Sequence, residues 1–157
     1  MATSDGNLHA HPQSTAKIAG HPIHPMLVPF PIVCFMGALV ADIAYLTYGG
    51  HGWAVGSRIL LLVGLIMAAL AAIAGLTDFL GEKRIQGPDA VKHMLANVTA
   101  VVLELINLIL RWHNDAAIPK IGVYISVVVV LILLYSGWKG GDLVYRYGMG
   151  VRDRSDA

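Results

Sequence analysis

The sequence predicts an all-α protein, a membrane-spanning antiparallel four-helix bundle. Charged residues make up only 13% of the 157 residues and apolar residues make up 56%, whereas soluble domains average about 25% and 45–50%. The apolar residues fall into four runs of roughly 20 residues, the length that crosses a bilayer. Because the connections between the runs are short, consecutive helices are expected to be antiparallel.

The spans are expected at residues 26–48, 59–80, 91–112 and 121–138, inside one transmembrane domain of residues 20–151. Residues 1–19 are predicted to be a flexible cytoplasmic tail, and residues 152–157 are predicted to be a short tail. Eight basic residues lie on the side of the termini and three on the opposite side, which predicts that both termini are cytoplasmic. The near-neutral net charge of +1 gives no reason to expect a nucleic-acid partner.

Two histidines, each followed by proline, precede the first span in Gly20-His21-Pro22-Ile23-His24-Pro25. Residues before proline favour extended backbone, and in a polyproline turn the two histidines would face one way with their backbones about 9 Å apart. That separation is wide for a shared metal ion. We therefore expect one direct ligand and one supporting histidine, and His24 is the predicted ligand because it is nearer to the apolar run.

The second span is predicted to be a packing helix, because small residues recur every three or four positions: Gly64, Ala68, Ala71, Ala72 and Gly75. Asp78 lies near its end and has two interpretations. It is either a helix-end carboxylate paired with Lys83 or Arg84, or a carboxylate that orients a histidine.

The third span carries a polar stripe, since residues at steps of three and four fall on one helix face: His93, Asn97, Ala100, Glu104, Asn107 and Arg111. Ionisable groups at membrane depth nearly always face a bundle interior. We expect Glu104, and Asp42 of the first span, to be paired with Arg58 or Arg111. A proton relay along the stripe is the alternative.

The fourth span has only Tyr124 and Ser126 as polar residues between Ile121 and Leu134, so it is predicted to face lipid. The paired glycines Gly140 and Gly141 are expected to break the helix. The residues that follow, 143–147, suit a segment at the level of the lipid headgroups.

Three histidines from two helices share one membrane boundary: His21, His24 and His93. This number suffices for bis-histidine haem ligation or for a metal site, and Asp78 is a further candidate for a metal ligand. For each histidine alone, a hydrogen-bonded interfacial imidazole is the alternative. We find no nucleophile, base and oxyanion arrangement that predicts an enzyme.

Four motifs resemble a family of bacterial four-helix membrane proteins classed only as a domain of unknown function: Gly20–Pro25 leading into Val28–Ile32, Gly75–Asp78, His93 with Asn97, and Gly140–Tyr145. Members look similar to the two-haem cytochrome b superfamily, and some are fused to electron-transfer domains. The resemblance implies a protein of the bacterial inner membrane that holds a haem b and passes electrons to a redox protein or a larger membrane complex. A small proton- or solute-conducting transporter and a structural subunit are the alternatives.

Overall fold

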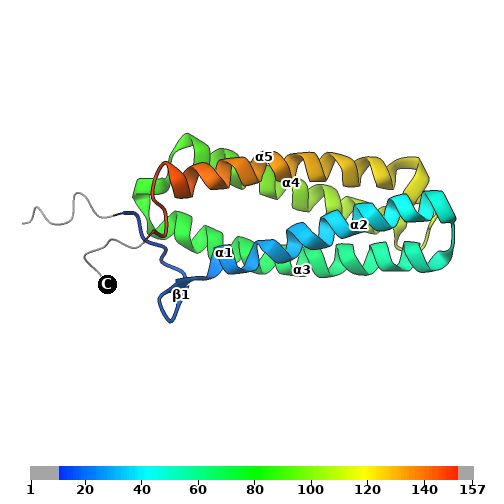
Figure 1. Cartoon of the computed structure of the whole chain (residues 1–157), viewed down its shortest axis with the longest axis horizontal. Helices are drawn as coiled ribbons and strands as arrows, with labels where there is room; N and C mark the ends of the chain where they lie inside the picture. The colour runs from blue at the N-terminus through cyan, green and yellow to red at the C-terminus, as the bar shows by residue number, and fades with distance from the viewer. Residues whose placement is uncertain (1–10, 152–157) are drawn as a thin grey trace, which may run out of the picture.

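The computed structural model describes residues 11–151 as a bundle of long helices (Figure 1). In chain order the elements are β1 (Lys17–Ile18), β2 (His21–Pro22), α1 (Ile23–Leu27), α2 (Pro29–Tyr48), α3 (His51–Gly81), the 3-10 helix η2 (Lys83–Ile85), α4 (Pro88–Arg111), the π-helical turn η3 (Ile118–Gly122) and α5 (Val123–Tyr145). Helix α1 leads into α2 and η3 leads into α5, so the described residues contain four helices long and apolar enough to cross a membrane. The predicted fold class is confirmed.

The bundle has two ends, which we name for the segments that they carry (Figure 1). The terminal end carries residues 11–22, 82–87 and 146–151, and the distal end carries residues 49–50 and 112–117. At the distal end, α2 turns into α3 through two glycines with positive φ, Gly49 at 68° and Gly50 at 94°. Glycine adopts these angles without steric penalty, and the tight turn makes α2 and α3 antiparallel neighbours.

Apolar side chains cover the outside of the bundle, and three charged side chains of residues 11–151 are fully buried inside it. Ile73 and Ile109 are each 65% exposed, whereas Asp42, Glu104 and Arg111 are 0% exposed. A soluble domain has the reverse arrangement. Hydrocarbon solvates such an apolar exterior, while polar groups at this depth must find partners within the protein. The distribution is therefore that of an integral membrane protein.

An apolar layer crosses the bundle near its middle, with one buried residue from each long helix: Ala38, Leu61, Ala100 and Val129. Each of these residues lies three or four positions, about one helical turn, from a buried polar residue of its own helix: Asp42, Ser57, Glu104 and Ser126 respectively. On every helix the polar residue is on the distal side. The apolar layer therefore bounds a polar cluster in the distal half of the bundle.

The helix boundaries differ from the prediction in two places. Helix α3 begins at His51 rather than at residue 59, and α5 continues through Gly140 and Gly141 to Tyr145. Glycine inside a helix costs only about 1 kcal/mol, and the space that the missing side chain of Gly140 leaves is filled by the ring of His93. The expectation of a helix break at the paired glycines was wrong.

The N-terminal segment also differs from the predicted flexible tail. Residues 1–10, like the predicted tail 152–157, lie outside the described residues. From His11 onward the chain lies against the terminal end, where Ser14 is 4% exposed and β1 pairs with β2. The histidines are not in a polyproline turn, because His24 lies within α1. Pro25 is tolerated there because the first helical turn leaves its N–H groups without helical partners.

Candidate functional site

Two histidines meet at the terminal end of the bundle. His24 comes from α1 and His93 from the beginning of α4, and their ring centroids are 6.2 Å apart with the ring planes at 89°. Both side chains are partly buried. The fold thus brings together a histidine near the beginning of the first helical hairpin and a histidine near the beginning of the second.

Each of these rings is fixed by a backbone carbonyl of the helix that follows it. His24 Nδ1 lies 2.8 Å from Ala71 O in α3, and His93 Nδ1 lies 2.9 Å from Ser136 O in α5. A carbonyl only accepts hydrogen bonds, so in each neutral ring Nδ1 carries the hydrogen and Nε2 has the lone pair. Proteins orient histidine ligands in this way.

Each ring also packs on a glycine four residues beyond the carbonyl that it binds. A Cβ atom at Gly75 would lie 2.9 Å from the ring of His24, and one at Gly140 would lie 3.0 Å from the ring of His93. The two hairpins therefore repeat one arrangement, in which a histidine occupies a groove that a glycine opens. The sequence signal for this repeat is the spacing Ala71-x-x-x-Gly75 and Ser136-x-x-x-Gly140.

Asn97 and Ser136 complete the surroundings of His93. Asn97 Nδ2 lies 3.1 Å from His93 Nε2 and also donates to His93 O at 2.9 Å, and Ser136 Oγ lies 3.1 Å from His93 Nδ1. A ligand at Nε2 would replace the first of these bonds and leave the second intact. Sequence reasoning missed Ser136, which lies outside the histidine motifs.

The other two predicted ligands at this boundary have different partners. His21 is exposed, and its Nδ1 lies 3.0 Å from Ala19 O. Asp78 is buried, and its Oδ1 accepts hydrogen bonds from Ser14 Oγ and from the backbone N–H groups of Thr15 and Ala16, each at 2.8 Å. Asp78 thus fastens the N-terminal segment to the bundle. Between residues 11 and 151, no three His, Cys, Asp or Glu side chains gather closely enough to hold a metal ion.

Among residues 11–151, Asp78 forms no ion pair with Lys83 or Arg84, so the predicted pair was wrong. Arg84 instead pairs with Glu82, with Nη2 2.7 Å from Oε2. The hydrogen bonds from Arg84 lower the pKa of Glu82 to about 2. Glu82 is therefore ionised at neutral pH.

A second polar centre, the distal cluster, lies beyond the apolar layer and consists of Asp42, Ser57, Glu104, Asn107, Arg111 and Ser126, all 0% exposed. Arg111 is at its centre. Its Nη1 and Nη2 donate to the two carboxylate oxygens of Asp42 at 2.6 and 3.1 Å, and Nη2 also donates to Asn107 Oδ1 at 2.6 Å. Bidentate pairs of this kind are among the strongest in proteins.

Ser126 corrects the prediction that the fourth span only faces lipid and packs. Ser126 of α5 is buried and donates to Asp42 Oδ2 at 2.8 Å, whereas Tyr124 is 65% exposed. Ser57 of α3 likewise donates to Asp42 Oδ1 at 2.6 Å. Ser126 is a single serine in an apolar run, and Ser57 precedes Arg58 ahead of the expected second span. Neither position shows the face of the helix on which the serine lies.

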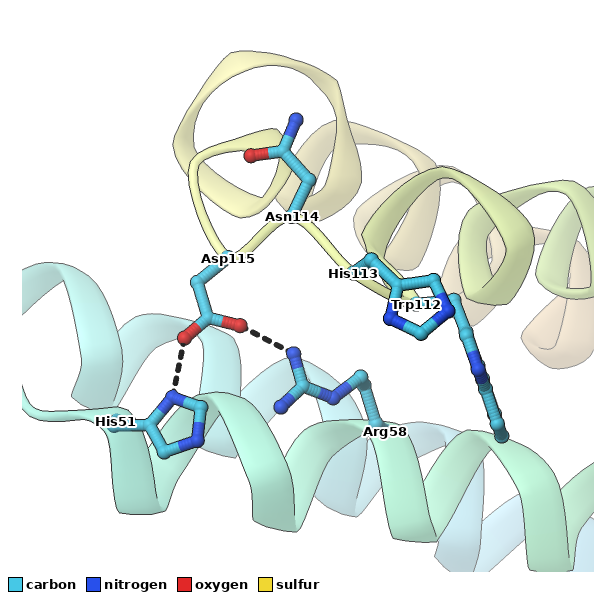
Figure 2. A pocket seen from close by; sticks show the side chains of 6 residues that line it. All are labelled: His51, Arg58, Trp112, His113, Asn114 and Asp115. Carbon is cyan, nitrogen blue, oxygen red and sulfur yellow. Dashed lines mark hydrogen bonds and ion pairs between the residues drawn. The ribbon is translucent and has the colours of Figure 1, made fainter.

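The remaining arginine of this half, Arg58, pairs with Asp115 instead of with Asp42 or Glu104. His51 Nδ1 also donates to Asp115, at 2.6 Å from Oδ2. The hydrogen bonds from His51 and Arg58 lower the pKa of Asp115 below its usual range. Figure 2 shows these residues around a pocket of about 400 Å³ at the distal end, lined by His51, Arg58, Trp112, His113, Asn114 and Asp115.

Four apolar helices with polar groups buried between them define an integral, multi-pass membrane protein. Residues 20–153 match the family described as "Predicted membrane protein (DUF2231)", and the chain belongs to this family. No curated protein and no solved structure matches the chain.

Proposed function

We propose that this membrane protein holds a haem b between His24 and His93 and transfers electrons. The observation that supports the proposal is the separation of 6.2 Å between the two ring centroids. Two imidazoles that bind one metal ion from opposite sides, at about 2.0–2.1 Å each, have centroids roughly 6 Å apart. The hydrogen bonds of both Nδ1 atoms leave the Nε2 atoms for this role.

The number of donors favours haem over a bare metal ion. Structural zinc sites take four protein ligands, whereas haem brings four equatorial nitrogens and needs only axial ligands from the protein. The histidine pair supplies two donors of the required type. When bound, the haem supplies a one-electron redox couple, and the chain's own part is to orient both imidazoles through Ala71 O and Ser136 O.

The apolar layer favours electron transfer over conduction of protons or solutes. Ala100 is 1% exposed and lies between Asn97 and Glu104 on the polar stripe of α4. A conducted ion would have to cross this layer, where ionic groups are strongly disfavoured. The histidine pair and the distal cluster are therefore two separate centres.

The proposal predicts that protein purified from haem-replete cells has a low-spin haem spectrum. His24→Ala and His93→Ala should each abolish or strongly alter it, because each removes one axial ligand. His21→Ala is the matched control from the same motif and should leave the spectrum unchanged, since His21 is exposed and bonded to Ala19 O. A colourless wild-type protein, or a spectrum that is insensitive to both ligand variants, would contradict haem binding.

The charge distribution supports a proposed orientation in a bacterial inner membrane, with the terminal end in the cytoplasm. Eight basic residues flank the terminal end in the sequence, against three towards the distal end, and cytoplasmic flanks are enriched in basic residues. One of the three, Arg111, is buried against Asp42 and adds no charge to the distal surface. A redox partner would then approach the histidine pair from the cytoplasmic side.

Reporter fusions test this orientation. A reporter that is active only in the cytoplasm should be active after residue 157 and inactive when it is inserted between Gly49 and Gly50, because three membrane spans separate the two positions in the sequence. Activity at the distal site together with inactivity at residue 157 would invert the proposed orientation.

A further inference from the structure

The distal cluster contains more acidic than basic groups. Two carboxyl groups, Asp42 and Glu104, accompany one guanidinium, Arg111, and all three side chains are 0% exposed. Arg111 is permanently protonated, and both of its Nη atoms are bonded to Asp42. If Asp42 and Glu104 were both ionised, the cluster would have a net charge of −1 (−2 from the acids, +1 from Arg111). With a neutral Glu104, the net charge is zero.

Hydrogen bonding at Glu104 also fits the neutral acid. Asn107 Nδ2 donates to Oε2 at 2.8 Å, while Oε1 is buried and has no hydrogen-bond partner among residues 11–151. Asn107 Oδ1 is bonded to Arg111, which fixes the direction of the amide group. Leaving a buried carboxylate with one hydrogen bond costs much more than leaving a neutral acid in the same place.

The groups that the other helices direct into the cluster do not supply a positive charge that would balance an ionised Glu104. Asp42 comes from α2, and the hydroxyl groups of Ser57 and Ser126 come from α3 and α5. The two hydroxyl groups do not titrate, and both donate to Asp42. Arg111 is the one cation in the cluster, and its guanidinium is bonded to Asp42, Ser57 and Asn107.

Among residues 11–151, polar contacts lead from the distal cluster towards the distal surface and not towards the terminal end. Towards the terminal end, Ala100 of the apolar layer is one turn from Glu104. Towards the distal end, Arg58 Nη1 donates to Arg111 O at 3.3 Å, and Arg58 pairs with Asp115. Asp115 and the exposed His51 border the pocket in Figure 2, which lies at the distal end of the bundle.

We propose that Glu104 is a proton-binding site of this protein, occupied at neutral pH and exchanging its proton with the distal face. The proton completes a charge-neutral cluster with Asp42 and Arg111, and it does not cross the apolar layer. This site is independent of haem at the histidine pair, because it depends on none of the contacts of His24 or His93.

Infrared spectroscopy tests the occupied site directly. The chain contains two glutamates, Glu82 and Glu104, so labelling with 13C-glutamate should shift the carbonyl band of a protonated carboxyl group at neutral pH. Glu104→Gln should remove this band, while the control Glu82→Gln should retain it, because the pKa of Glu82 is about 2. Absence of a label-sensitive band in the wild type, or its loss in Glu82→Gln, would overturn the proposal. The labelling experiment on the wild-type protein tests the proposal even if the Glu104→Gln variant fails to fold.

Vesicles with a single known orientation test the exchange path. Raising the pH on the distal side should remove the protonated-carboxyl band, whereas raising it only on the terminal side should leave the band unchanged. Loss of the band from the terminal side would show that the apolar layer does not isolate the site, and the exchange path would be refuted. Both results are read without haem, so they do not depend on the proposed electron transfer.

Discussion

Replacing Arg111 with methionine is expected to destabilise the protein by about 3–5 kcal/mol, the usual consequence of removing one partner of a buried ion pair. Asp42 would retain the hydrogen bonds from Ser57 and Ser126 but would lose two bonds from the guanidinium, at 2.6 and 3.1 Å. A carboxylate at 0% exposure would then have no counter-charge. Thermal unfolding in detergent, with the yield of monodisperse protein, measures the loss.

Two further variants separate the ion pair from general damage. Arg84→Met removes an arginine from the surface pair with Glu82, where the arginine side chain is 48% exposed, and should change stability by about 1 kcal/mol or less. The double variant Asp42→Leu/Arg111→Met replaces both charges by apolar groups and should recover much of the loss, as apolar replacement of buried pairs often does. If Arg111→Met were as stable as Arg84→Met, the pair would not hold the distal half together.

Gly75→Ala is the second substitution with a large expected effect, a destabilisation of about 1–3 kcal/mol from overpacking. Its Cβ atom would lie 2.9 Å from both Cε1 and Nδ1 of His24. The ring would have to leave Ala71 O, to which Nδ1 is bonded at 2.8 Å. Under the proposed function, the same variant should also weaken haem binding, which the absorption spectrum measures.

Gly56→Ala is the matched control on the same helix. Beyond the adjacent residues and the local backbone of α3, no heavy atom lies within 4 Å of a Cβ placed at Gly56. The substitution should therefore stabilise α3 by about 0.5–1 kcal/mol through the higher helix propensity of alanine. The two variants are thus expected to change the melting temperature in opposite directions. Equal effects at both positions would mean that the His24 ring does not need the groove at Gly75.

Local sequence properties were sufficient to predict the fold class. Hydropathy along the chain predicted four spans, because a helix that crosses hydrocarbon needs a long apolar run whatever its neighbours are. The steps of three and four residues on the third span predicted that Glu104, Asn107 and Arg111 share a face, and all three are buried. Similarly, the positions of His24 and His93 at the beginnings of two spans predicted one shared membrane boundary.

The partners of these residues depended on helix packing. Both Arg58 and Arg111 were within reach of Asp42 by sequence, but Arg111 binds Asp42 while Arg58 binds Asp115. Which arginine points inward depends on the rotation of each helix about its axis and on its depth relative to its neighbours, and hydropathy contains neither quantity. For the same reason, the sequence did not predict that Ser126 points inward. Its neighbours in the sequence are apolar, and its polar partners, Asn107 of α4 and Asp42 of α2, come close only when α5 packs against these helices.

Proline and glycine interrupt the helices of this chain less than their intrinsic conformational preferences suggest. Pro25 lies inside α1, and α5 continues through Gly140 because the ring of His93 fills the space beside it. Asp78, in turn, orders residues 14–16 instead of pairing with a nearby lysine or arginine. Apolar runs and residue periodicity are properties of the chain itself, whereas these contacts join segments more than 40 residues apart and exist only once the helices have packed.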